Sequence, residues 1–202
     1  MIHQAGCIGP ARKMRLKTRR RSGMSEVIDL RRRLVAKGAE RAFRNWRKRF
    51  NEAFAVNMTF SSMSMPTLAF LALGKEDSAF YFYDLIMNIR RMGSGFEFNV
   101  LKPAKKMLVT DQYLFLLDQA RYECMQRFGW LQSRPGEDFT IVELIENFDI
   151  VAPSIQAEIP ILAVSHPRYD EFAELGVIEK ESFIRGLIPA VLDELERYSS
   201  TL

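Results

Sequence analysis

The segment from Ser25 to about Val56 carries the apolar period of one long helix, which constrains the fold more than any other feature of the sequence. Ser25 is a preferred N-cap residue, and Glu26 and Asp29 suit the positive end of a helix. A helix of roughly 30 residues spans about 45 Å. Its apolar and basic side chains fall on opposite sides, so we expect one side to be buried against the rest of the chain.

The two sides of this predicted helix differ in chemistry. Five cations fall within an arc of roughly 80° on one side, namely Arg33, Lys37, Arg41, Arg44 and Lys48. The opposite side is apolar, small at its beginning and aromatic at its end, and comprises Val35, Ala39, Ala42, Phe43, Trp46, Phe50 and Ala53. We expect Phe43, Trp46 and Phe50 to be mostly buried against central helices. Gly38 weakens the helix by about 1 kcal/mol relative to alanine.

Further helices follow from apolar periods that are bounded by proline, glycine and capping residues. The predicted ranges are about 66–73, 76–92, 103–128, 140–148, 166–175 and 179–198, the last kinked or split at Pro189. Thr140 and Glu143 have the spacing of a capping box, whereas the alternation from Phe96 to Leu101 predicts a short extended piece. We therefore expect an all-α, single-domain bundle of about six to eight helices over residues 24–202, with a long basic amphipathic N-terminal helix.

Charge is distributed unevenly along the chain. The first 50 residues carry 16 Lys/Arg and three Asp/Glu, whereas the other 152 carry 13 Lys/Arg and 22 Asp/Glu. The acidic residues concentrate at the end, where residues 137–202 hold 14 Asp/Glu and four Lys/Arg. A basic arm joined to an acidic body predicts an acidic partner, inside the protein or outside it. The C-terminal third of the same chain, or of a neighbouring copy, fits that description.

Residues 1–23 are expected to be a disordered basic tail, because they hold seven Lys/Arg, no Asp/Glu and no apolar period. Three other interpretations stay open. The tail is an untranslated leader read as protein, with translation starting at Met24; or an organelle transit peptide; or a nucleic-acid-binding arm. We expect no secretory signal, since no apolar stretch follows the first residues.

Residues suited to catalysis or metal binding are sparse. The histidines are His3 and His166 and the cysteines are Cys7 and Cys124, with none of the spacings of a zinc or di-iron site. We interpret Cys124 as a buried structural thiol and His166 as a loop imidazole at a helix start. The sequence thus predicts no catalytic residue, no metal ligand and no cofactor, which favours a non-enzymatic role.

Two further charged groups have both a structural and a ligand-binding interpretation. Carboxylates spaced three apart over residues 143–149, and again over residues 170–174, could share a divalent ion, but a solvated helix face is the favoured interpretation. Arg90 and Arg91 could contact an anion at the end of a predicted helix. Helix C-cap chemistry explains both arginines without a ligand.

The basic side of the first helix supplies the functional hypotheses. We expect a cytoplasmic protein, since two cysteines in 202 residues favour a reducing compartment, with an interaction or scaffold role and a protein partner, self or other. The alternative is a nucleic-acid-binding module that uses the basic face of residues 31–49. A membrane surface is the disfavoured partner, and no apolar run reaches the ~18 residues of a transmembrane segment.

Overall fold

The structure, a computed structural model, describes the backbone of residues 22–200 and the side chains of residues 30–200. This part of the chain is mostly helical, with nine α-helices, two short 3-10 helices and one two-stranded sheet. The α-helices are α1 (Ser22–Phe50), α2 (Met65–Ala72), α3 (Glu76–Ile89), α4 (Pro103–Arg127), α5 (Ile141–Glu146), α6 (Phe148–Gln156), α7 (Tyr169–Glu174), α8 (Val177–Gly186) and α9 (Ile188–Ser200). The 3-10 helices are η1 (Phe60–Ser62) and η2 (Gly95–Val100), and the strands are β1 (Leu131–Ser133) and β2 (Ile161–Leu162).

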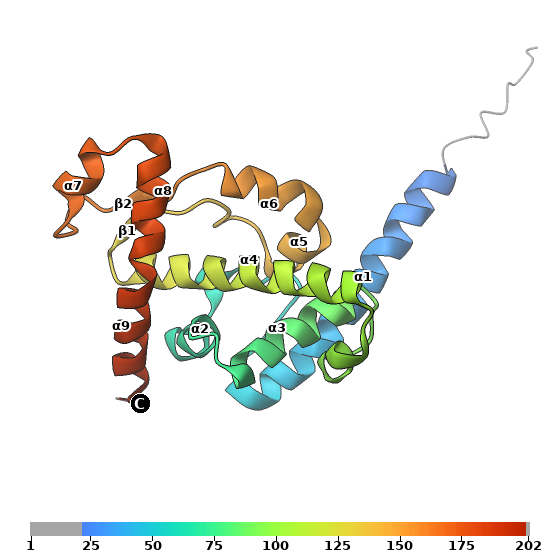
Figure 1. The fold of residues 1–202 in the computed structure, drawn as a ribbon. Helices are drawn as coiled ribbons and strands as arrows, with labels where there is room; N and C mark the ends of the chain where they lie inside the picture. Colours follow the sequence, from blue (N-terminus) through green and yellow to red (C-terminus); the bar gives the residue numbers. More distant parts are fainter. Residues whose placement is uncertain (1–21, 201–202) are drawn as a thin grey trace, which may run out of the picture.

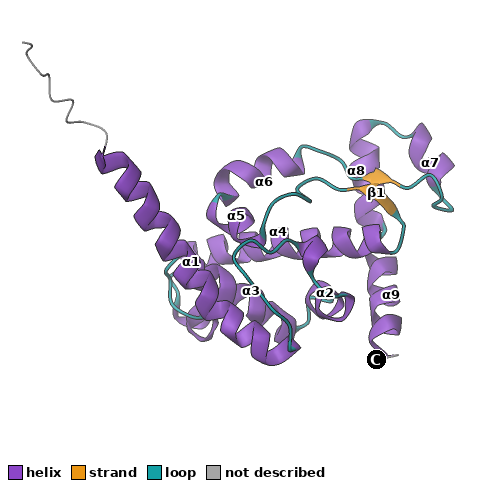
Figure 2. Ribbon diagram, turned by 180° about the vertical axis from the view of Figure 1, so that it is seen from behind, coloured by secondary structure: helices purple, strands orange, loops and turns teal. Residues whose placement is uncertain are grey.

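The helices are arranged around α4, which runs through the middle of the molecule (Figure 1). On one side of α4 lie α2 and α3, and α1 packs along α3. On the other side lie α5 and α6, while α9 packs across α2 and α4 at the far end, as the reverse view also shows (Figure 2). One cluster of buried apolar residues runs through these helices. None of the described helices is both long and apolar enough to cross a bilayer.

The helix α1 differs from its prediction at both ends. It begins at Ser22 rather than Ser25 and ends at Phe50 rather than near Val56. Asn51 stops it, because this residue takes a left-handed conformation with φ of 55° while its N–H still donates to Arg47 O at 3.0 Å. The predicted disordered tail falls on residues 1–21, outside the described residues, and on the first two residues of α1.

Aromatic side chains fill the space between α1 and α3. Phe43 and Trp46 are fully buried and Phe50 is partly buried, as predicted, whereas Ala53, also predicted on this side, lies beyond the end of α1 and is exposed. The ring of Trp46 meets those of Phe54 and Phe82 edge-on, with centroids 5.3 and 6.1 Å away. The apolar side of α1 therefore faces the core, and the basic side faces away from it.

The prediction of a short extended piece at Phe96–Leu101 is wrong, because η2 occupies this range. A capping box starts η2: Ser94 N donates to Glu97 Oε2 at 2.8 Å. The ring of Phe98 stacks on Tyr83 of α3, whereas Phe96 stays mostly exposed, so the alternating apolar residues do not share one face. The strands lie elsewhere: β1 and β2 pair antiparallel, with Leu131 opposite Leu162, and neither strand was predicted from the sequence.

The described residues form nine α-helices, where about six to eight were expected. The difference lies partly in the last predicted helix, which is divided into α8 and α9 just before Pro189. Pro189 is the second residue of α9, where a missing N–H costs no intrahelical bond. The predicted capping box of α5 is present, since Glu143 N donates to Thr140 Oγ1 at 3.1 Å and Thr140 N donates to Glu143 Oε2 at 2.9 Å.

Candidate functional site

The five cations that the sequence singles out lie exposed in one row along α1. We call Arg33, Lys37, Arg41, Arg44 and Lys48 the basic face. Successive members are three or four positions apart, so each stands about 4.5 or 6 Å further along the helix axis. The row therefore presents repeated positive charge to any partner that approaches α1 from the solvent.

Contacts with α3 determine which side of α1 faces the solvent. Gly38 lies against the main chain of Asn88, so close that a Cβ at position 38 would stand 2.8 Å from the Asn88 carbonyl carbon. About two turns further along α1, Asn45 Nδ2 donates to the buried Asp84 Oδ2 at 3.0 Å. These contacts, together with the buried ring of Trp46, fix the rotation of α1 about its own axis. The basic face consequently points away from the core.

Four members of the basic face lack an acidic partner within the described residues. Lys37, Arg41, Arg44 and Lys48 form no ion pair with any residue of the range 30–200. Two neighbouring cations of α1 are engaged: Arg47 pairs with Glu40 at 3.0 Å, and Arg49 lies over the ring of Phe70.

The acidic C-terminal third of the chain reaches α1 at a different place. Arg31 Nε lies 3.1 Å from Glu146 Oε1 of α5, which joins the two oppositely charged regions. The predicted neutralisation within one chain thus involves Arg31 and does not extend to Lys37, Arg41, Arg44 and Lys48 among the described residues. Those four charges stay available to an acidic partner outside the chain.

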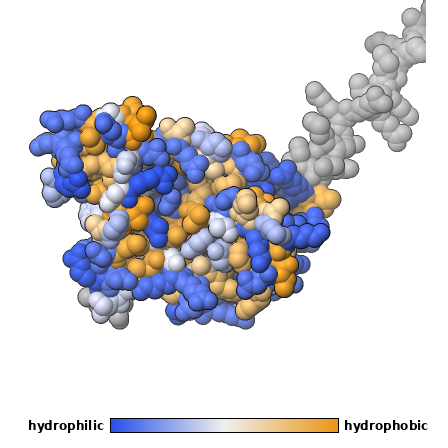
Figure 3. Space-filling model, viewed as in Figure 1, coloured by the Kyte–Doolittle hydropathy of each residue, from blue (hydrophilic) through white to orange (hydrophobic). Residues whose placement is uncertain are grey.

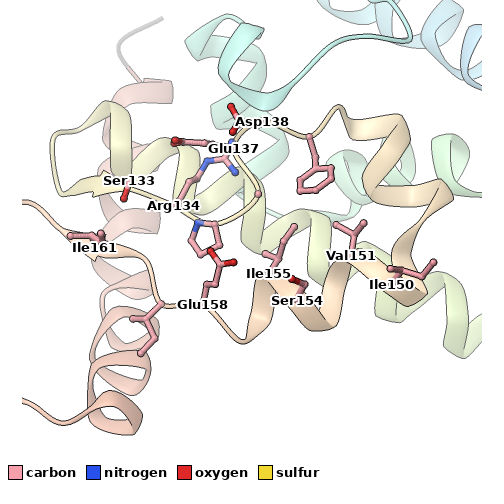
Figure 4. Close-up of a pocket in the computed structure, with 14 residues that line it drawn as sticks. Ser133, Arg134, Glu137, Asp138, Ile150, Val151, Ser154, Ile155, Glu158 and Ile161 are labelled. Carbon is pink, nitrogen blue, oxygen red and sulfur yellow. The ribbon is translucent and has the colours of Figure 1, made fainter.

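A second charged surface was not predicted from the sequence. It is an open groove of about 570 Å³ between the loop 133–139 and α6. Figure 4 shows the loop residues Arg134, Glu137 and Asp138 on one side and the side chains of α6 on the other. We call this cavity the acidic groove; its lining includes the carboxylates of Glu137, Asp138 and Glu158 and the apolar side chains of Phe139, Ile150, Val151, Ile155, Ile159 and Ile161.

The loop wall of the acidic groove is anchored to α4 through a buried charge cluster. Arg134 donates to Glu123 Oε2 from Nε at 3.1 Å and from Nη2 at 2.9 Å, and its Nη1 donates to Gln119 Oε1 at 3.0 Å. The other oxygen of Glu123 accepts from Arg127 Nε at 2.9 Å. Arg134 is therefore already hydrogen-bonded inward, and its charge does not offset that of the groove carboxylates in full.

A glycine lets this loop approach α6 closely. Gly136 has a φ of +79°, and a Cβ there would stand 2.5 Å from Ile155 Cδ1. Its left-handed backbone conformation favours glycine, and a larger residue would also displace the end of the Ile155 side chain. The Pro135-Gly136 pair predicted a loop, but its position against α6 depends on Glu123 and Ile155 from other helices. No local pattern in the sequence indicates that pairing.

The lining of the acidic groove suits a cationic group on an apolar stem. Ile150 is 78% exposed and Ile161 50% exposed, so large apolar side chains at this groove are open to solvent. Asp138 and Glu158 are exposed and form no ion pair with any described residue. In Figure 3 hydrophobic residues reach the surface as patches within a mostly hydrophilic exterior. Apolar surface beside unpaired carboxylates is typical of a binding groove.

The residues considered for catalysis have structural partners. His166 Nδ1 accepts from the main-chain N–H of Arg168 at 3.2 Å, and its ring packs against Trp130. Burial and the Arg168 charge lower the pKa of His166, and no described carboxylate hydrogen-bonds it. Cys124 is fully buried, as predicted, and burial raises the pKa of its thiol to about 12. That thiol is therefore protonated and inaccessible at neutral pH.

Other charged groups also have local roles. Within the described part of the chain no three His, Cys, Asp or Glu side chains form a cluster that could hold a metal ion. In the two acidic segments, Glu143 caps α5 and Glu171 pairs with Arg168 at 2.6 Å. Arg90 is the C-cap of α3, which ends at Ile89 rather than near residue 92 as predicted, and Arg91 follows it with a φ of 60°.

Comparison with known proteins adds no family to this picture. No family model, no curated protein and no solved structure matches the chain. The basic face and the acidic groove are therefore the two surfaces from which a function can be inferred.

Proposed function

We propose that this chain is a cytoplasmic, non-enzymatic interaction protein with a scaffold role, and that its basic amphipathic N-terminal helix binds an acidic protein surface. The observation that carries the proposal is the exposed row of Lys37, Arg41, Arg44 and Lys48, four cations without an ion-pair partner among the described residues. Such a row raises the local concentration of acidic partners and accelerates their association. The buried free thiol of Cys124 agrees with a reducing compartment.

A protein partner is favoured over nucleic acid because the basic face lacks an aromatic platform. Proteins that bind single strands combine cations with exposed rings on which bases stack. On α1 the rings of Phe43 and Trp46 are fully buried and face the opposite side of the helix. An acidic protein surface needs charge alone, which this face supplies.

Nucleic acid is the second candidate, and the regular spacing of the cations favours it. From Lys37 to Lys48 the row extends about 16 Å along the helix axis, with a cation every 4.5 or 6 Å or so. A row of this kind could follow several phosphates of a backbone without reading the bases.

Binding assays with three polyanions test the proposal. Fluorescence anisotropy of labelled poly-glutamate, single-stranded RNA and duplex DNA would be measured at about 50 and about 200 mM salt. We expect poly-glutamate to bind at the lower salt and to weaken at the higher salt. Binding confined to RNA or DNA would support the second candidate, and absence of binding to all three probes at low salt would refute both.

A matched pair of variants locates the binding surface. Arg41→Gln/Arg44→Gln neutralises two charges of the basic face, and Lys102→Gln/Lys105→Gln neutralises two exposed charges at the start of α4. At about 0.2–1 kcal/mol for each exposed pair, the first variant should weaken binding about 2- to 30-fold. The second should leave it within error of the unmodified protein. Equal losses in both variants would contradict a site on α1.

A further inference from the structure

We infer that the acidic groove is the docking site for the basic face of a second copy of this chain. The inference rests on the proposed function and identifies its acidic partner. It joins two observations that are independent of each other: unpaired cations on α1 and unpaired carboxylates beside exposed apolar side chains at α6.

The charges of the two surfaces are complementary within a single sequence. Residues 24–50 carry nine Lys/Arg and three Asp/Glu, whereas residues 137–202 carry four Lys/Arg and 14 Asp/Glu. At the groove, Asp138 and Glu158 form no ion pair with a described residue, and Glu137 accepts only from the neutral amide of Gln126 at 3.1 Å. Each copy therefore displays both halves of an electrostatic contact.

The two halves do not meet within one copy. Gly38 lies against Asn88, and Trp46 is fully buried, so α1 is held against α3 with its basic face turned outward. Turning that face toward the groove of the same chain would require this buried side to leave the core. A second copy can approach the face without any such change.

The size and lining of the groove match the side chains of the basic face rather than a whole helix. Two turns of α-helix with a diameter of about 10 Å occupy about 850 Å³, more than the cavity volume of about 570 Å³. In the inferred contact α1 lies across the mouth of the groove and its lysine and arginine side chains enter. Their methylene stems cover Ile150 and Ile155 while their charged ends reach Asp138 and Glu158.

Covering this groove also explains its exposed apolar side chains. Ile150 on α6 is 78% exposed in one copy and lines the cavity, so a second copy seated there would cover it. Because the basic face and the acidic groove are different patches, copies either pair twice about a two-fold axis or join head to tail. Both arrangements bury the same residues.

A charge-swap experiment with the full chain tests the inference. One variant reverses the basic face, Lys37→Glu/Arg41→Glu/Arg44→Glu/Lys48→Glu, and the other reverses the groove, Asp138→Lys/Glu158→Lys. Molar mass would be measured by light scattering after gel filtration at about 50 and about 200 mM salt. We expect the unmodified protein to exceed its monomer mass of 23.4 kDa at low salt and to approach that mass at high salt.

The mixture of the two variants provides the decisive observation. Each variant alone should run as a monomer at low salt, because one half of the contact is reversed. Mixed in equal amounts they should associate again. The reversed, acidic face of one variant meets the reversed, basic groove of the other, and the unmodified face and groove also meet with opposite charge. An unmodified protein that stays monomeric at low salt, or a mixture that stays monomeric, would overturn the inference.

Two controls exclude other occupants and unfolding. Lys102→Glu/Lys105→Glu should keep the mass of the unmodified protein, and a chain that starts at Met24 should keep it too. Loss of association in the shorter chain would identify the basic tail as the occupant and overturn the inference. Circular dichroism checks folding, and Arg41→Glu/Arg44→Glu replaces the fourfold variant if that one unfolds.

Monomeric behaviour together with retained poly-glutamate binding would reject this inference alone, whereas loss of all polyanion binding would reject the proposed function.

Discussion

Gly38 of α1 lies directly against the main-chain carbonyl group of Asn88 in α3, so that the two helices are in backbone contact at this position. A Cβ at position 38 would stand 2.8 Å from the carbonyl carbon of Asn88 and 3.1 Å from Ile89 Cα. Both atoms belong to the backbone of a buried helix and have little freedom to move. The lower helix propensity of this glycine is therefore offset by the close packing that it permits.

Gly38→Ala should destabilise the protein, although alanine is the better helix former. Propensity alone predicts a gain of about 1 kcal/mol. The backbone collision should outweigh it and lower the free energy of unfolding by about 1–3 kcal/mol. Urea denaturation followed by circular dichroism measures the change. Gly186→Ala is the control, because a Cβ there meets nothing within 4 Å, and it should be neutral or stabilising. A stabilising Gly38→Ala would show that the two helices separate more easily than the structure implies.

Trp46→Ala should lower the free energy of unfolding by about 3–5 kcal/mol, since a fully buried large ring leaves a cavity when it is truncated. Trp46→Phe should cost less than the alanine variant. It keeps most of the packing and removes the Trp46 Nε1 group, which is buried without a hydrogen-bond partner among the described residues. The midpoint of urea unfolding reports both effects. Trp130→Ala, at a half-buried ring, should have the smaller effect, and equal costs at the two tryptophans would contradict the packing of Trp46.

Glu123→Gln should destabilise the protein by about 3–5 kcal/mol, because it leaves the buried Arg134 guanidinium without its carboxylate. Arg134 is 1% exposed and Glu123 is 6% exposed at their side chains, so water cannot replace the lost partner. Glu171→Gln is the matched control, since its ion pair with Arg168 is about half exposed on both sides, where solvent screening leaves little net stabilisation, and this variant should cost far less than Glu123→Gln. Thermal melts of the two variants, compared with the unmodified protein, separate the buried cluster from the surface pair.

The buried thiol of Cys124 should make the folded protein less stable at alkaline pH. Burial raises the pKa of its thiol from 9.0 to about 12, so between these values the unfolded chain releases a proton that the folded protein keeps. The unfolded state then binds fewer protons, and the free energy of unfolding falls as pH rises from about 9 toward 12. In a Cys7→Ser background, Cys124→Ala should make this decline shallower. An unchanged slope would show that other groups account for the titration.

The same thiol should resist modification in the folded protein. At pH 8 a thiol reagent should react with Cys124 far more slowly in buffer than in concentrated urea, because both burial and the raised pKa suppress the thiolate. The Cys7→Ser background makes Cys124 the reporting thiol. Rapid reaction in buffer would mean that α4 opens locally to solvent.

Features that depend on neighbouring residues were predictable from the sequence. The proline starts of α2 and α4, the Thr140–Glu143 capping box and the burial of Phe43 and Trp46 agree with the expectations. Each was predicted from residue types spaced within a few helical turns of one another, although the burial itself involves packing against α3. The end of α1 at Phe50 was harder to predict from the sequence, because the apolar pattern continues beyond it while Asn51 adopts a left-handed conformation. The η2 segment was misjudged because two-residue alternation predicts a strand, whereas the Ser94–Glu97 capping box and the contact of Phe98 with Tyr83 favour a tight helix here.

The sequence by itself determined the helical periods and the basic face, because residues three and four apart share a side of any helix wherever it packs. Only the tertiary structure decided that Lys37, Arg41, Arg44 and Lys48 lack an acidic partner among the described residues. It alone also decided that the loop at Gly136 and helix α6 form an acidic groove. Both depend on pairs far apart in the chain, such as Gly38 with Asn88 and Arg134 with Glu123, whose meeting follows from how the helices pack together and from no local pattern.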